Sequence, residues 1–179
     1  MNDWPIKQLL VFHNRVEKIY PFLQDVVAFI ERHLPQKADQ ISFSARVIVT
    51  ELLTNSIKHA GKGETGIELS ISPDVFIIKK IDQGEPFDLK QEGATWPLDN
   101  DIKTPVKIYS DALNGLYANI ISPYSLSFYA ESYPNNNDTF EDISEHYGLV
   151  IICRASSSFV YLYNPRSRQN IFTVTINLV

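Results

Sequence analysis

The stretch VTELLTNSIKHA, residues 49–60, forms the second half of a helix that the sequence predicts over residues 39–60. Asp39 is a suitable N-cap for this helix, and Gly61 follows it as a C-terminal cap. Apolar residues occupy nearly every side of the helix, which is typical of a buried one: Ile41, Phe43, Ala45, Ile48, Leu52, Leu53 and Ile57. Polar groups on a buried helix need partners, so those within residues 49–60 are the first candidates for a functional site.

Three polar residues of this stretch, Glu51, Asn55 and His59, are spaced four apart. They line one edge of the helix over about 12 Å, from a rise of 1.5 Å per residue. Asn55 lies next to Ile48 on the helical wheel, so this edge borders the buried side of the helix. The spacing alone is equally compatible with a binding edge and with an ordinary solvated edge that carries an i,i+4 pair.

A second polar motif, IDQGEPFD at residues 81–88, stands where a predicted strand ends. Asp82 places a carboxylate at the strand end, and Gly84 follows it without a side chain that would obstruct a ligand. Such a carboxylate can accept a hydrogen bond from an exocyclic amine. Taken alone, the motif fits an ordinary Asp-x-Gly turn better than a binding site.

The remaining elements surround these two motifs. Helical periodicity predicts helices over residues 16–34, 143–155 and, in a shorter form, 111–121. Alternating or short apolar runs predict strands at 7–13, 66–72, 75–81, 124–133, 159–163 and 171–178. The order predicts an α+β fold: a single domain over residues 1–179, built as a two-layer α/β sandwich with helices on one face of a mixed, mostly antiparallel sheet. Residues 88–145 form a long variable segment in this scheme.

Together and in this order, the two motifs resemble those of a known superfamily. ELLTNSIKHA, residues 51–60, looks like the N-box of the GHKL (Bergerat-fold) ATPases, and IDQGEPFD looks like their first glycine box. The Pro-Phe-Asp ending is similar to the anti-sigma-factor serine kinase branch. HYGLVII, residues 146–152, falls where the family has its second glycine box and the following helix. The resemblance covers about residues 7–179 and implies the Bergerat ATP-binding fold.

The resemblance also implies roles for individual residues of the N-box. Asn55 would coordinate Mg²⁺, since an amide oxygen is a suitable hard ligand. Glu51 would be the general base that takes a proton from a partner's serine hydroxyl or from water. Lys58 would face the phosphates of ATP, and His59 would cover the same edge of the nucleotide.

On the adenine side, the resemblance implies that Asp82 accepts a hydrogen bond from the N6 amine and that Gly84 lets the ring pack closely. Gly148 would belong to the phosphate-binding second box. Active members of the family have a glycine-rich second box, whereas this chain keeps only Gly148 and places His146 and Tyr147 before it. Where the family often has Gly-Thr before its last strand, this chain has Gln169-Asn170, and Asn170 would replace the threonine's hydrogen bond near adenine.

Composition excludes several classes of protein. The 179 residues are 44% hydrophobic and 21% charged, which is close to the globular average. A formal net charge of −5 argues against direct nucleic-acid binding, because there is no basic excess to displace counterions. We expect no membrane partner, since no apolar run approaches 18 residues. The single Cys153 fits a cytoplasmic location, and its apolar surroundings indicate a structural thiol.

The residues and the resemblance together favour an ATP-binding regulatory protein similar to the anti-sigma-factor serine/threonine kinases. Its cofactors would be ATP and Mg²⁺, and its partner a sigma factor or an anti-anti-sigma-like antagonist, with a homodimer also compatible. Two further hypotheses stay open: a non-catalytic interaction module of the same fold, and a standalone GHKL ATPase. The glycine-poor second box favours the module, whereas the Glu51–Asn55 pair speaks for a nucleotide-dependent protein.

Overall fold

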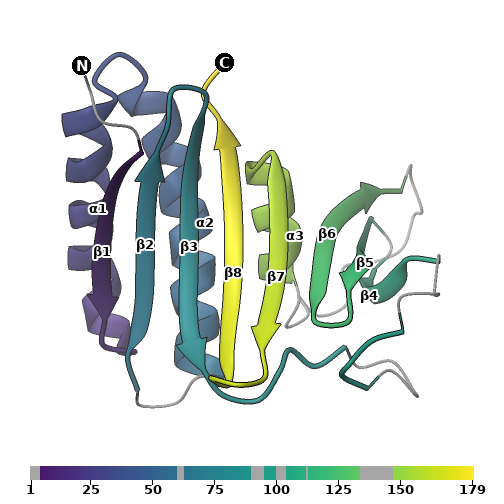
Figure 1. Ribbon diagram of the computed structural model, residues 1–179. Helices are drawn as coiled ribbons and strands as arrows, with labels where there is room; N and C mark the ends of the chain where they lie inside the picture. Colours follow the sequence, from purple (N-terminus) through teal and green to yellow (C-terminus); the bar gives the residue numbers. More distant parts are fainter. Residues whose placement is uncertain (1–4, 60–62, 90–94, 100–103, 112, 134–146) are drawn as a thin grey trace.

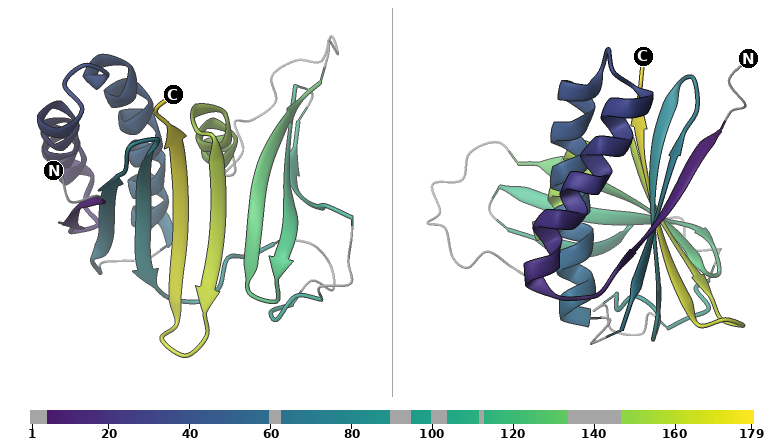
Figure 2. Two further views of the ribbon diagram at one scale, coloured as in Figure 1. Left: turned by 45° about the horizontal axis from the view of Figure 1, so that its top comes forward. Right: turned by 90° about the vertical axis from the view of Figure 1, so that its left-hand side faces the viewer.

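The computed structural model of the protein describes residues 5–59, 63–89, 95–99, 104–111, 113–133 and 147–179. Eight strands within these residues form one sheet in the order β1-β2-β3-β8-β7-β6-β5-β4 (Figure 1). They are β1 (Ile6–Phe12), β2 (Thr65–Ile71), β3 (Val75–Gln83), β4 (Val106–Ser110), β5 (Asn114–Ser122), β6 (Ser125–Ser132), β7 (Ser158–Asn164) and β8 (Gln169–Asn177). The sheet is strongly twisted, as Figure 2 shows.

Three α-helices accompany the sheet in the described part of the chain: α1 (Ile19–His33), α2 (Ala38–His59) and α3 (Tyr147–Ala155). A 3-10 turn, η1 (Val16–Lys18), leads into α1. The helices α1 and α2 lie behind β1, β2, β3 and β8 in Figure 1, and α2 packs on both α1 and α3. The central helix α2 has Ile48, Val49 and Leu53 fully buried, but it is not buried on every side, because Phe43 is 73% exposed. None of these helices combines the length and the apolarity that a membrane crossing needs.

Most of the predicted elements are confirmed. The predicted helices over residues 16–34 and 39–60 correspond to η1 with α1 and to α2. The strands expected at 7–13, 66–72, 75–81, 124–133, 159–163 and 171–178 correspond to β1, β2, β3, β6, β7 and β8. The end of the second helix at Ala60, its Gly61 cap and the first residues of the helix expected from residue 143 lie outside the described residues.

The predicted Bergerat fold, a two-layer α/β sandwich with helices on one face of a mixed, mostly antiparallel sheet, is wrong. Every neighbouring pair of strands is antiparallel, and the sheet has eight strands against three α-helices among the described residues. The difference arises in the segment expected to be variable. Three strands, β4 to β6, fold there as a meander that joins the edge of β7 and carries the sheet beyond α1 and α2 (Figure 1), while α3 packs on β5 and β6. Short turns between consecutive strands permit only antiparallel neighbours, so a meander extends the sheet without helices.

The short helix expected over residues 111–121 is also wrong, because that segment contains β5. Its apolar residues Leu116, Ile120 and Ile121 are compatible with helical spacing, but β5 hydrogen-bonds to β4 on one side and to β6 on the other. Aromatic and β-branched residues such as Tyr117 and Ile120 suit a strand with neighbours on both sides. Tertiary pairing therefore overrides the weak local pattern.

The alternation of β3 sets the position of the functional site. Phe76, Ile78, Lys80 and Asp82 are buried and share one side of the strand, which is the side that faces α2. The first two residues belong to the hydrophobic core. The last two continue the same row toward the end of the strand, so a polar pair follows directly on the core.

Candidate functional site

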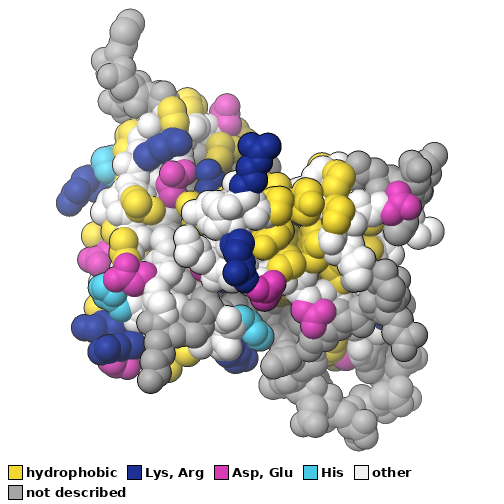
Figure 3. Space-filling model, turned by 60° about the horizontal axis from the view of Figure 1, so that its bottom comes forward, with side chains coloured by type: hydrophobic (Ala, Val, Ile, Leu, Met, Phe, Trp, Pro, Cys, Tyr) yellow, Lys and Arg dark blue, Asp and Glu magenta, His cyan; other side chains and the backbone are white. Residues whose placement is uncertain are grey.

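A pocket of about 350 Å³ opens at the end of β3, where α2 ends and α3 begins. Its volume lies at the lower end of the range for small-molecule sites. Figure 3 shows the molecule from this end of the sheet, where charged side chains stand beside a group of hydrophobic ones. The pocket is lined by Asn55, His59, Lys80, Asp82, Gln83, Gly84, Glu85, Pro86, Phe87, Asp88, Leu149, Asn170 and Phe172.

Four of the residues that the sequence nominates, Asn55, His59, Asp82 and Gly84, line this one pocket. The first two come from the last turns of α2, and the other two come from the end of β3 and the turn that follows it. The two sequence motifs, residues 51–60 and 81–88, are therefore adjacent in space. Gly84 has a φ of +156°, which a residue with a side chain rarely adopts, so the turn itself requires glycine.

Glu51 and Gly148 meet each other beside the pocket and are not among its lining residues. A side chain at Gly148 would collide with the Glu51 carboxylate, so glycine lets the first turn of α3 approach α2. Burial raises the pKa of Glu51 above its ordinary value, and the positive charge of Lys58 opposes that shift. Lys58 itself is exposed and does not line the pocket.

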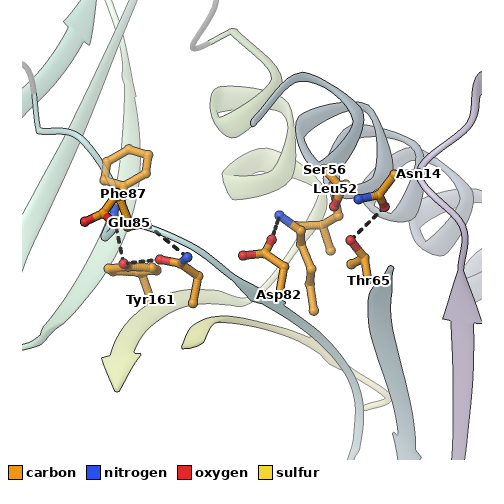
Figure 4. Close-up of polar contacts among 10 residues, drawn as sticks. Asn14, Leu52, Ser56, Thr65, Asp82, Glu85, Phe87 and Tyr161 are labelled. Carbon is orange, nitrogen blue, oxygen red and sulfur yellow. Dashed lines mark hydrogen bonds and ion pairs between the residues drawn. The ribbon is translucent and has the colours of Figure 1, made fainter. Parts of the chain in front are cut away.

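The floor of the pocket carries a buried ion pair. Lys80 Nζ lies 2.5 Å from Asp82 Oδ2, and the two side chains are only 4% and 8% exposed (Figure 4). The ammonium also lies 4.9 Å from the centre of the Phe172 ring, a cation–π distance. Burial lowers the pKa of Lys80, and the Asp82 carboxylate opposes that shift. Motif comparison missed Lys80, although the period of two along β3 places it on the same side as Ile78 and Asp82.

A hydrogen-bond network holds the segment 84–88 against the sheet (Figure 4). The Tyr161 hydroxyl accepts a hydrogen bond from Phe87 N–H at 2.8 Å and donates one to Asn170 Oδ1 at 2.6 Å. Asn170 Nδ2 donates to the Glu85 carbonyl at 3.1 Å. Both ends of the Asn170 amide are engaged in this network, so the residue positions the pocket rim, a role that the comparison with the family's threonine did not predict.

Two features narrow the chemistry that this arrangement can perform. Within the described residues, His, Cys, Asp and Glu side chains form no group of three that could hold a metal ion. The pocket lining includes the Asn55 amide and the carboxylates of Asp82, Glu85 and Asp88, which are oxygen donors of the kind that Mg²⁺ prefers. Cys153 is partly buried on α3, and burial raises its thiol pKa to about 12. This thiol is therefore no candidate nucleophile.

The sequence matches no model of a known protein family, and no curated protein is significantly similar to it.

Proposed function

We propose that the protein is a regulatory protein that binds Mg-ATP in the pocket between α2 and the end of β3. The observation that carries this proposal is the meeting of two separate sequence motifs in one pocket, with Asn55 and His59 from one and Asp82 and Gly84 from the other. Two of these lining residues, Asn55 and Asp82, are 27 positions apart in the sequence.

Each lining residue then has a chemical task. Asp82 accepts a hydrogen bond from the exocyclic amine of adenine, and Gly84 allows the ring to approach the backbone. Asn55 supplies an oxygen ligand to Mg²⁺, which offsets the negative charge of the triphosphate. Leu149 brings the first turn of α3 to the pocket, where the positive end of the helix dipole favours phosphate. Glu51 stands one turn before Asn55, with a raised pKa suited to a general base.

Isothermal titration calorimetry with ATP and Mg²⁺ tests the proposal. We expect binding to the wild-type protein and a loss of at least about tenfold in affinity for Asp82→Asn, because the carboxylate acceptor is weakened. Asp74→Asn is the matched control: it makes the same chemical change at an exposed position before β3 begins, at the opposite end of that strand. Absence of heat with the wild type, or equal affinity for the wild type and Asp82→Asn, would refute ATP binding in this pocket.

A second candidate function, a non-catalytic interaction module, has its own supporting observation. The Glu51 carboxylate packs against Gly148 at the start of α3, so the residue assigned as general base contacts a helix and lies beside the pocket. In this case the protein binds its partner, and any nucleotide, without turnover. Phosphate release from ATP and transfer of γ-phosphate to a serine peptide separate the two functions. Turnover that Glu51→Gln abolishes supports the catalytic function, and binding without turnover supports the module.

A further inference from the structure

The floor of the pocket presents a hydrogen-bond donor and an acceptor side by side. Lys80 has three N–H donors in its ammonium form; its Nζ bonds to Asp82 Oδ2 and lies 4.9 Å from the centre of the Phe172 ring. In the described part of the chain, Lys80 Nζ and Asp82 Oδ1 make no further hydrogen bond, so both can bond to a ligand. Both side chains line the pocket although each is more than nine-tenths buried.

Burying two charged side chains is costly, and a hydrophobic pair of similar size is often as stable or more stable. The inward side of β3 begins with two apolar residues, Phe76 and Ile78, and apolar residues could also occupy its last two positions. Those positions instead hold an ion pair that lines the cavity. The cost of burying this pair is explained if a ligand forms hydrogen bonds with it. Such a ligand must carry a hydrogen-bond acceptor for Lys80 and a donor for Asp82 on neighbouring atoms.

We propose that Lys80 determines base specificity in this pocket, by donating a hydrogen bond to N1 of adenine while Asp82 Oδ1 accepts one from the N6 amine. This inference rests on the proposed function, namely ATP binding in the same pocket. It adds a direct contact to a second atom of the base, made by a residue outside both sequence motifs. The Phe172 ring beneath the ammonium fixes the position of the Lys80 side chain.

The pair also disfavours guanine. Guanine presents one acceptor, O6, and two adjacent donors, N1–H and N2–H₂. In the orientation that pairs adenine with Lys80 and Asp82, guanine would place its acceptor O6 against the Asp82 carboxylate and its donor N1–H against the Lys80 ammonium. Acceptor would then face acceptor and donor would face donor, and the loss of both hydrogen bonds weakens binding.

The test compares three Mg-nucleotides by calorimetry: ATP, 1-deaza-ATP, in which a C–H replaces N1, and GTP. We expect the wild-type protein to bind ATP about 10- to 100-fold more tightly than either analogue, the range for one lost hydrogen bond to a charged group. In Lys80→Met, ATP and 1-deaza-ATP should bind with equal affinity. Lys79→Met is the control, because Lys79 lies on the opposite side of β3 and bonds to Glu68.

Lys80→Met leaves the Asp82 carboxylate buried without its partner, so Lys80→Met/Asp82→Asn, which removes that charge and keeps an acceptor oxygen for N6, is measured alongside it. Retained N1 discrimination in a folded Lys80→Met protein overturns the inference, as does equal affinity of the wild type for ATP and GTP. If the wild type binds ATP and 1-deaza-ATP equally well, the Lys80 contact is rejected and ATP binding in the pocket stands. Absence of binding of any of the three nucleotides to the wild type rejects the proposed function and this inference with it.

Discussion

Glu51 is a half-buried carboxylate between two helices, and its surroundings make its ionisation matter for stability. Burial raises its pKa above the ordinary value of 4.5, with the charge of Lys58 acting in the opposite direction. A folded-state pKa above that of the unfolded chain means that the folded protein binds more protons just above pH 4.5. The contribution of Glu51 to stability is therefore fully present below about pH 4 and is lost as the pH rises through the raised pKa.

Glu51→Gln should consequently be more stable than the wild type at pH 7 and about equally stable at pH 4, because glutamine keeps the shape without the buried charge. Urea unfolding followed by tryptophan fluorescence at the two pH values measures the difference. Glu31→Gln, at an exposed position of α1, is the control and should show no such pH-dependent gain. A constant difference between Glu51→Gln and the wild type at both pH values would contradict this account.

Cys153 should be unreactive in the folded protein. Burial raises its thiol pKa to about 12, so the thiolate fraction at pH 8 is very small. We expect alkylation by iodoacetamide at pH 8 to be more than about 100-fold slower in the native protein than in urea. Mass spectrometry of the quenched reaction gives both rates. Similar rates in the two states would show that the thiol is open to solvent.

At the scale of single elements, β5 depends on a glycine beneath two tyrosine rings. Tyr117 and Tyr133 share a hydrogen bond of 2.5 Å between their hydroxyl groups, and Tyr117 stacks on Tyr129 with ring centres 5.5 Å apart. A methyl group at Gly115 would lie 2.6 Å from Tyr117 Cε2 and would also collide with the Tyr133 hydroxyl. The tyrosine cluster can form across β5 and β6 because Gly115 has no side chain.

Gly115→Ala should therefore destabilise the protein by about 1–3 kcal/mol, the usual cost of overpacking. Gly66→Ala in β2 is the matched control, since a methyl group there would meet its nearest neighbours at 3.7 Å, an ordinary van der Waals distance. The control should change stability by no more than about 0.5 kcal/mol. Chemical denaturation measures the free energy of unfolding of the two variants. Equal values for both would contradict tight packing around Gly115.

The hydroxyl of Tyr161 links β7 to the pocket rim. Tyr161→Phe removes the acceptor for Phe87 N–H and the donor to Asn170, so we expect a loss of about 1–3 kcal/mol in the free energy of unfolding. Tyr163→Phe tests the same change two residues along the same side of the strand, where the hydroxyl has no hydrogen bond to the described residues. In thermal unfolding, the melting temperature should decrease clearly for Tyr161→Phe and by less for Tyr163→Phe. The opposite order would mean that the network does not hold segment 84–88.

Across the whole molecule, the sheet is joined more firmly on one side than on the other. The strand β8 pairs with β3 along its whole length, from Gln169 to Asn177, whereas β6 pairs with β7 only over residues 125–128. The helices α1 and α2 lie behind the first group of strands (Figure 1). The strands β4 to β6 are therefore the part of the sheet with the weaker attachment.

Native-state hydrogen exchange should reflect this difference. We expect amides of β5 to exchange through openings of lower free energy than amides of β2, β3 and β8, because local opening follows the density of buried contacts. Mass spectrometry of peptides from each strand measures the protection. Equal protection of β5 and β3 would show that the meander unfolds together with the rest of the sheet.

The candidate site shows how far the sequence leads. Local spacing places Asn55 and His59 on one edge of α2, and a strand-end motif marks Asp82 and Gly84, so these four of the lining residues can be predicted without a structure. Lys80 cannot be predicted in this way, because a lysine in a strand is ordinarily exposed. Its burial depends on α2 covering that side of β3, which no local pattern records.

The sequence by itself determined most of the local elements, because periods of 3.6 and of two residues follow from backbone geometry alone. The strands β4 and β5 are the exceptions. Only the tertiary structure decided the sheet. The neighbouring strands β3 and β8 are far apart in the chain. The meander β4 to β6 joins the sheet where β6 pairs with residues 159–162 of β7. Pairing between distant strands depends on the whole packed sheet, and the pocket with its Lys80–Asp82 floor exists only once that packing is complete.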